Sequence, residues 1–114
     1  MRSGAATPEE LESLFEDALI LGDARAVARL FDARAVLAAD SGVLQARGAH
    51  EIASLAAAMC ERGYAYLADP RRIVHARDTT LVVAEGATNV MRRLPDGWRY
   101  VISLIESDRQ GATR

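Results

Sequence analysis

The stretch TTLVVAEGATNVMRRLPDGWRYVISLIE, residues 79–106, contains two long apolar runs joined by Leu94-Pro95-Asp96-Gly97-Trp98. Pro95 presets φ for the first corner of a type I turn, and Asp96 suits the second corner. Gly97 adopts positive φ at no steric cost. These residues predict a β-hairpin whose three-residue loop is closed by a glycine bulge.

This loop predicts which residues of the hairpin face one another. One side pairs Leu94 with Trp98, Arg92 with Tyr100, Val90 with Ile102, and Thr88 with Leu104. The other side pairs Arg93 with Arg99, Met91 with Val101, Asn89 with Ser103, and Ala87 with Ile105. Both sides are apolar in their middles, so we expect each of them to be covered.

The strands before the hairpin are expected to form a bent sheet. Residues 80–93 read as one strand, which would measure about 45 Å at roughly 3.3 Å per residue. Gly86 is the natural place for a bulge that bends such a strand. Residues 64–68 and 73–77 are also strand-like, and Pro70 between them predicts a sheet edge or a bulge because proline cannot donate to a ladder.

The N-terminal half is predicted to be mainly helical. Thr7-Pro8-Glu9-Glu10 has the pattern of a capped helix start, and Gly22 is placed to end that helix. Asp23 then caps a second helix. Residues 35–39 and 43–46 predict a small hairpin, and residues 48–62 a third helix that ends at Gly63. Helices followed by a curved sheet that folds over them give an α+β architecture.

Composition limits the classes of function. The 114 residues fit one domain over residues 8–107, with flexible tails at 1–7 and 108–114. A net charge of −2 argues against a nucleic-acid partner, and no apolar run approaches the ~20 residues that span a bilayer. The single cysteine, Cys60, excludes an intrachain disulfide, and the two histidines lack carboxylates at ligand spacing. We therefore expect a soluble cytoplasmic protein without a cofactor or a metal.

The order of these elements resembles the nuclear transport factor 2-like superfamily, which includes SnoaL-like polyketide cyclases and ketosteroid isomerases. The residues that carry the resemblance are Gly22-Asp23, Leu30-Phe31-Asp32, Asp40, Gly48-Ala49-His50-Glu51-Ile52, and the run from Arg92 to Arg99. The resemblance implies a cone-shaped, cystatin-like α+β roll with a strongly curved mixed or antiparallel sheet and three N-terminal helices. It also implies a pocket in the concave face and a homodimer through the outer face.

The resemblance implies two kinds of function for such a domain. One is binding of a small apolar or aromatic molecule, with general acid–base isomerisation or cyclisation. The other is a non-enzymatic module for dimerisation or ligand sensing, with a closed pocket. Many small bacterial relatives end in a run like Trp-Arg-Ile-Val-His-Asp-His. Here those last three positions hold Ile102, Ser103 and Leu104, which removes acid–base groups from the final strand and favours the second kind.

Asp40 is the candidate catalytic base, because it lies near where the isomerase members place a carboxylate. The alternative is that Asp40-Ser41-Gly42 is an ordinary turn. The candidate pocket residues are Phe15, Phe31, Met59, His75, Asn89, Met91, Tyr100 and Ser103.

Several of these candidates allow two interpretations. His75 is either a pocket base or a strand residue at the solvent edge. Asn89 and Ser103 hold a ligand oxygen if their side of the hairpin is concave, and bond across the ladder or a dimer interface if it is convex. Tyr64, Tyr66 and Tyr100 are either oxyanion donors or packing residues. Arg92, Arg93 and Arg99 form either an anion site or a solvated sheet end.

Overall fold

The computed structural model describes residues 4–40, 42–64 and 70–106. Three helices occupy the first part of the chain: α1 (Pro8–Leu21), α2 (Ala24–Arg29) and α3 (Gly48–Glu61). The described residues also form six strands: β1 (Phe31–Ala39), β2 (Leu44–Arg47), β3 (Pro70–Ala76), β4 (Thr79–Ala84), β5 (Ala87–Leu94) and β6 (Gly97–Ile105). The predicted α+β class and the three predicted helices are confirmed.

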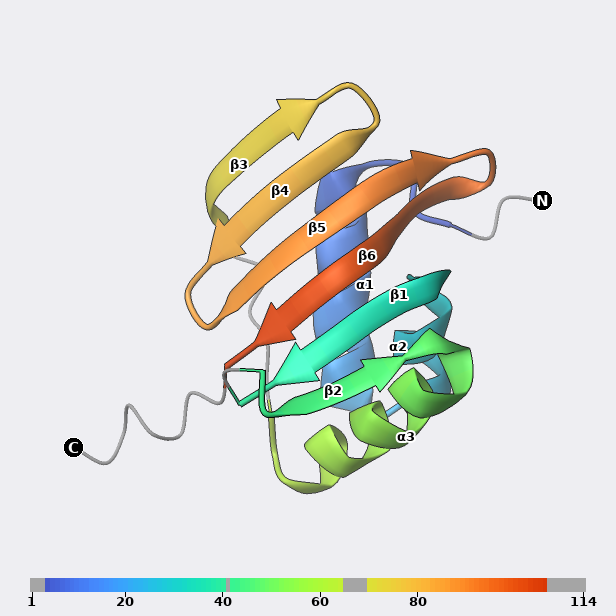
Figure 1. The fold of residues 1–114 in the computed structure, drawn as a ribbon, viewed down its shortest axis with the longest axis vertical. Coiled ribbons are helices and arrows are strands. Elements are labelled where there is room, and N and C mark those ends of the chain that lie inside the picture. Colours follow the sequence, from blue (N-terminus) through green and yellow to red (C-terminus); the bar gives the residue numbers. More distant parts are fainter. Residues whose placement is uncertain (1–3, 41, 65–69, 107–114) are drawn as a thin grey trace.

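The six strands form one sheet in the order β2-β1-β6-β5-β4-β3. Neighbouring strands are antiparallel except β1 and β6, which run parallel, so the sheet is mixed. The helix α1 crosses one face of the sheet, while α2 and α3 lie beside β1 and β2 (Figure 1). The other face, which points toward the viewer in Figure 1, carries none of these helices.

The capping residues behave as the sequence predicts. The Thr7 hydroxyl accepts a hydrogen bond from the Glu10 amide at 3.0 Å, and the Glu10 carboxylate accepts one from the Ala6 amide at 2.6 Å. Gly22 ends α1 in the left-handed conformation with φ of 69°, and the Asp23 carboxylate accepts from the Ala26 amide at the start of α2. The Thr7 and Asp23 contacts each satisfy an amide that the first turn of a helix leaves without a partner, while the Glu10 contact fixes the chain just before the cap of α1.

The β5–β6 hairpin follows the predicted register in the half farther from the loop and departs from it near the loop. Ala87, Thr88, Asn89 and Val90 face their predicted partners. Leu94, however, pairs with Gly97, so the loop has two residues, not three. The extra residue lies instead at Val101, where the register shifts, because Val90 pairs with Ile102 and Met91 with Tyr100. The bulge predicted at Gly97 was therefore placed four residues too early.

The predicted long strand over residues 80–93 is wrong. It is two strands, β4 and β5, which form a hairpin through Glu85 and Gly86. Gly86 has φ of 84°, a conformation that glycine adopts freely in a two-residue turn. The bend expected from a bulge is thus a full reversal of the chain. The predicted edge at Pro70 is confirmed, since β3 is the last strand of the sheet and its pairing is irregular between Pro70 and Arg72.

The N-terminal segment pairs with the hairpin tip. The Gly4 amide donates to the Asp96 carbonyl at 2.9 Å, and the Trp98 amide donates to the Ala5 carbonyl at 2.8 Å. Ala5 is buried, although we expected residues 1–7 to be a flexible tail. The predictions for residues 1–3, 65–68 and 107–114 fall outside the described residues. No helix among the described residues is long and apolar enough to cross a membrane.

Candidate functional site

A cluster of four buried polar side chains lies between α1 and the sheet. The Glu12 carboxylate accepts a hydrogen bond from the Tyr100 hydroxyl at 2.7 Å and one from the Asn89 side-chain amide at 3.1 Å. The Ser103 hydroxyl donates to the Asn89 side-chain oxygen at 2.6 Å. All four residues are at most 2% exposed. We call these residues the Glu12 cluster.

The bulge at Val101 brings the sheet members of this cluster onto one face. In a regular strand Tyr100 and Ser103 would point to opposite faces, because side chains alternate. The unpaired Val101 changes the phase, so that both residues are buried on the side of α1. Asn89 pairs directly with Ser103 in the ladder, which explains their short contact.

Glu12 was not among the residues singled out from the sequence. A signal was present, since Glu12 lies four residues after Pro8 and three before Phe15, and all three are on the buried face of α1. A carboxylate inside an apolar stripe requires partners when it is buried. The sequence cannot say that Tyr100 and Asn89 provide them, because the three residues come from separate elements.

Aromatic rings fill the space beside the Glu12 cluster. The Phe15 ring lies 6.2 Å from that of Phe31 and 5.3 Å from that of Tyr100, and the Phe31 and Tyr100 rings are 5.2 Å apart. Edge-on and tilted pairs at these distances are favourable packing arrangements. Met59 and Met91 belong to the same buried core and are at most 2% exposed.

Seven of the eight candidate pocket residues are therefore core residues, and the eighth, His75, is exposed. The His75 Nδ1 atom lies 2.9 Å from the hydroxyl oxygen of Thr80, its ladder partner, on the edge strand β3. Asn89 and Ser103 lie on the helix-covered face and bond to each other. Tyr66 lies outside the described residues.

Asp40 follows β1 and is partly exposed, apart from the Glu12 cluster. Its carboxylate accepts a hydrogen bond of 2.5 Å from the Tyr64 hydroxyl. Asp40 has φ of 54°, which is uncommon for a residue with a side chain, although aspartate adopts it more readily than most. The turn expected at this position is also present, because the Val43 amide donates to the Asp40 carbonyl at 3.1 Å.

The arginines at the hairpin tip do not form one cluster. Arg93 pairs with Asp78 across to the β3–β4 turn at 2.7 Å. Arg99 pairs with Asp96 at 2.8 Å, and its other terminal nitrogen donates to the Arg29 carbonyl at 2.7 Å. Arg92 is exposed and faces Arg99 in the ladder. The three guanidinium groups thus have three different surroundings.

A cavity of about 410 Å³ opens near Arg99. Its lining residues are Ala28, Arg29, Phe31, Asp32, Ala33, Ala49, Leu94, Asp96 and Arg99. They come from α2, the start of β1, the start of α3 and the tip of the β5–β6 hairpin. Of the eight pocket residues predicted from the sequence, Phe31 alone is among those that line this cavity.

Among the described residues, the other titratable side chains suggest no further chemical centre. Burial raises the pKa of the Cys60 thiol, and the negative charge of Asp23 adds to this effect. A raised thiol pKa makes the reactive thiolate scarcer at neutral pH. Within residues 4–40, 42–64 and 70–106, no three His, Cys, Asp or Glu side chains converge to hold a metal ion.

Comparison with known proteins identifies the fold. No protein-family model and no curated protein matches the sequence. Solved structures do match. One is a candidate association domain of calcium/calmodulin-dependent protein kinase type II from Thiobacillus denitrificans, with a TM-score of 0.71, 17% identity, and coverage of 90% of this chain and 96% of that one.

Two further structures agree. A ketosteroid isomerase-like protein from Erwinia carotovora atroseptica has a TM-score of 0.70 and 17% identity, covering 86% of this chain and 91% of its own. A nuclear transport factor 2-like protein with a cystatin-like fold, from Novosphingobium aromaticivorans, has a TM-score of 0.66 and 22% identity, covering 87% and 78%. The chain therefore has the nuclear transport factor 2-like, cystatin-like fold.

Proposed function

We propose that the chain is a homodimeric binding module, in which two copies meet through the helix-free face of the sheet. The supporting observation is a row of five aliphatic residues that crosses five strands. Val36 faces Ile102, Ile102 faces Val90, Val90 faces Leu81, and Leu81 faces Val74. At a strand spacing of about 4.8 Å, this cross-strand row is about 19 Å long.

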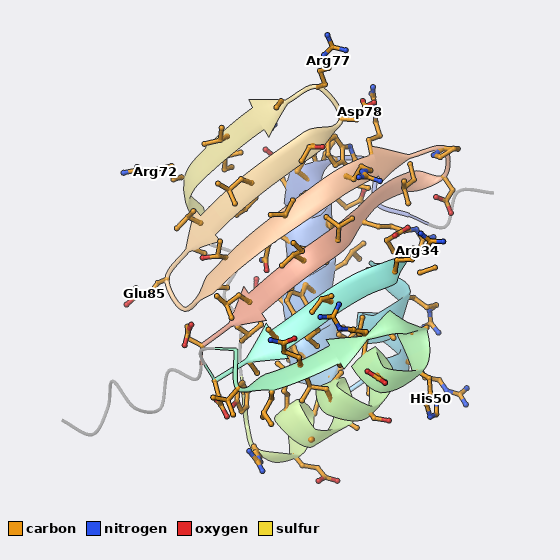
Figure 2. The ribbon with its side chains drawn as sticks, viewed as in Figure 1. Arg34, His50, Arg72, Arg77, Asp78 and Glu85 are labelled. Atoms are coloured by element: carbon orange, nitrogen blue, oxygen red, sulfur yellow. The ribbon has the colours of Figure 1, made fainter. Side chains whose placement is uncertain are left out.

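The cross-strand row is accessible to solvent in the single chain. Ile102 is 50% exposed and Val74 51%, while Val36, Leu81 and Val90 are partly exposed. Charged residues lie around this face: Figure 2 shows Arg72, Arg77, Asp78 and Glu85 at its margins. An apolar centre with a polar rim is the usual composition of a protein–protein interface. A twofold axis through the row would let each copy cover the other with the same residues.

The packed interior favours a binding module over an acid–base catalyst inside the cone. Phe15, Phe31 and Met59 are at most 4% exposed, and their side chains occupy the space between the helices and the sheet. The Glu12 cluster is fully engaged in hydrogen bonds, which stabilise the attachment of α1 to the sheet. A cytoplasmic location fits this proposal.

Sedimentation velocity at micromolar concentration tests the dimer. The wild-type chain is expected to sediment as a dimer, and Ile102→Glu as a monomer, because the variant would bury two carboxylates in the interface. Ile20→Glu is the matched control, since Ile20 is 69% exposed on α1 and lies away from the sheet face. A monomeric wild-type chain, or equal effects of the two variants, contradicts the proposal.

The Asp40–Tyr64 pair supports a second candidate function, proton transfer between two carbons of a bound ketone. Asp40 would remove a proton from the carbon next to the carbonyl and return it to the γ carbon. The Tyr64 hydroxyl donates to Asp40 in the resting structure, and once Asp40 holds the proton this hydroxyl would turn to donate to the developing oxyanion. The observation behind this candidate is the partly exposed carboxylate–phenol contact at the end of β1.

The test is isomerisation of β,γ-unsaturated ketones, followed by the absorbance of the conjugated product. Asp40→Asn should abolish turnover while circular dichroism stays unchanged. The matched control, Asp32→Asn, should keep turnover, because Asp32 lies at the other end of β1. Equal turnover in Asp40→Asn and the wild type rules this function out.

A further inference from the structure

The cavity near Arg99 exists because β1 separates from β6 over a short stretch. Phe31 pairs with Tyr100 and Val36 pairs with Ile102, so five steps along β1 accompany only two steps along β6. The residues of β1 between these two pairs, from Asp32 to Ala35, have no partner on β6 and leave the ladder. They pass the start of α3, where an added Cβ on Gly48 would lie 3.7 Å from the Ala33 carbonyl. We call the resulting hollow the splay cavity.

The splay cavity has an apolar wall and one rigid cation. Phe31, Leu94 and the methyl groups of three alanines line most of it. The Arg99 side chain is 17% exposed and is held from two sides by the Asp96 carboxylate and the Arg29 carbonyl. Its position is therefore fixed, and its charge is already balanced by Asp96.

The second cation, Arg29, is different. Arg29 is an exposed residue of the cavity lining, and its guanidinium has no hydrogen-bond or ion-pair partner in the part of the chain that the structure describes. The neighbouring Asp32 carboxylate accepts the Arg34 amide at 3.3 Å. Arg34 itself projects from the same edge of the molecule (Figure 2) and adds positive charge there. The lining thus combines an apolar wall with two charged residues that are not paired with each other, Arg29 and Asp32.

We propose that the splay cavity binds a small monocarboxylate with a short aliphatic or aromatic body. The planar guanidinium of Arg29 matches a carboxylate with two parallel hydrogen bonds. The body of the molecule would contact Phe31 and Leu94. A volume of about 410 Å³ lies within the range of small-molecule sites. A polyphosphate fits less well, because Arg99 is already paired and most of the wall is apolar.

This inference names a ligand class for the proposed binding module, but it does not depend on the dimer. None of the lining residues belongs to the cross-strand row. Measuring carboxylate binding by the Ile102→Glu variant would therefore separate the cavity proposal from the dimer proposal. If the monomeric variant binds as the wild type does, the cavity functions without dimerisation.

The test is a titration of the full chain with acetate, butyrate, hexanoate and benzoate, followed by backbone amide chemical shifts. Benzyl alcohol is the uncharged analogue of benzoate. We expect saturable binding of at least one carboxylate, with shifts centred on residues 28–33 and 94–99, and binding of benzyl alcohol weaker by roughly tenfold or more.

Three variants locate the site. Arg29→Gln should weaken carboxylate binding by roughly tenfold or more, because it removes the charged donor. Ala33→Trp should abolish binding by filling the cavity, and Ala33 is exposed, so the fold should tolerate the change. Arg25→Gln is the matched control, one turn earlier on α2 and outside the lining, and should bind as the wild type does. No saturation by any of the four carboxylates at millimolar concentration, equal binding of benzyl alcohol, or equal effects of Arg29→Gln and Arg25→Gln overturns the proposal.

Discussion

Replacing Tyr100 with Phe removes one oxygen atom from the Glu12 cluster and leaves the ring in place. The lost hydroxyl donates to the Glu12 carboxylate at 2.7 Å, and both residues are at most 2% exposed. Phenylalanine fills nearly the same volume, so the Phe15 and Phe31 contacts of the ring should persist. The variant therefore isolates the cost of leaving a buried carboxylate with one donor fewer.

The expected loss in the free energy of unfolding is about 1.5–3 kcal/mol, the range for hydrogen bonds to charged groups. Water cannot replace the hydroxyl easily at a site with so little exposure. In a domain of this size, each kcal/mol lowers Tm by about 4 °C or somewhat more. Urea denaturation at one fixed protein concentration is the assay, because dimerisation would make stability depend on concentration.

Tyr64→Phe is the matched control for this measurement. It makes the same chemical change to another tyrosine that donates to a carboxylate, that of Asp40, but this contact is only partly buried. Water can then replace the lost donor, so the expected loss is about 0.5–1.5 kcal/mol. If Tyr100→Phe lowers the free energy of unfolding no more than Tyr64→Phe does, or by less than about 0.5 kcal/mol, the buried hydrogen bonds of the Glu12 cluster do not stabilise the fold as expected.

Two further measurements test other parts of the fold. Gly97→Ala should destabilise the chain more than Gly22→Ala in urea denaturation. Both glycines have positive φ, but only at Gly97 would an added Cβ meet backbone, 2.6 Å from the Gly4 carbonyl carbon. Equal losses in the free energy of unfolding would contradict the close packing of Gly4 on the hairpin tip. Alkylation of Cys60 at mildly alkaline pH should be slower in the folded chain than in urea. Burial and the charge of Asp23 raise the pKa of the thiol, so less of the reactive thiolate forms in the folded chain as the pH rises. Asp23→Asn retains the α2 cap and should speed the folded-state reaction, whereas an unchanged rate would exclude a role for that charge.

Features set by neighbouring residues were predictable from the sequence. Thr7 and Glu10 cap α1 through contacts within four residues of each other, so a short motif contains all the information needed. The same holds for Asp23 at the start of α2. The pairing of Asn89 with Ser103 was also predicted correctly, although the loop that was used to derive it was not.

That agreement has a physical explanation. The predicted hairpin has a three-residue loop, and the observed one has a two-residue loop and one bulge at Val101. Both arrangements place one extra residue on β6, so the pairing beyond Val101 is the same in both. The sequence pattern detects the total number of extra residues, because the alternation of side chains must match the core. It does not detect where the extra residue lies. That position depends on packing against α1, which turns Tyr100 toward Glu12.

The candidate site was less predictable because its members are distant in the chain. Glu12 meets Asn89 across 77 residues, and no local motif links them. Asp40 and Tyr64 could each be proposed from the sequence, but their contact depends on how the chain returns after α3. The splay cavity depends on a mismatch between β1 and β6, two strands whose parallel pairing no turn motif reports.

One residue on β6 connects the interior with the splay cavity. Val101 lies between Tyr100 and Ile102, where the register shifts toward β5 on one side and toward β1 on the other. Toward β5, the shift brings Tyr100 and Ser103 onto the same buried face. Toward β1, it coincides with the departure of Asp32 to Ala35 from the ladder. The extra residue at Val101 accounts for the Glu12 cluster inside the fold. The same point of β6 faces the stretch of β1 whose surplus residues leave the ladder and open the splay cavity at the edge.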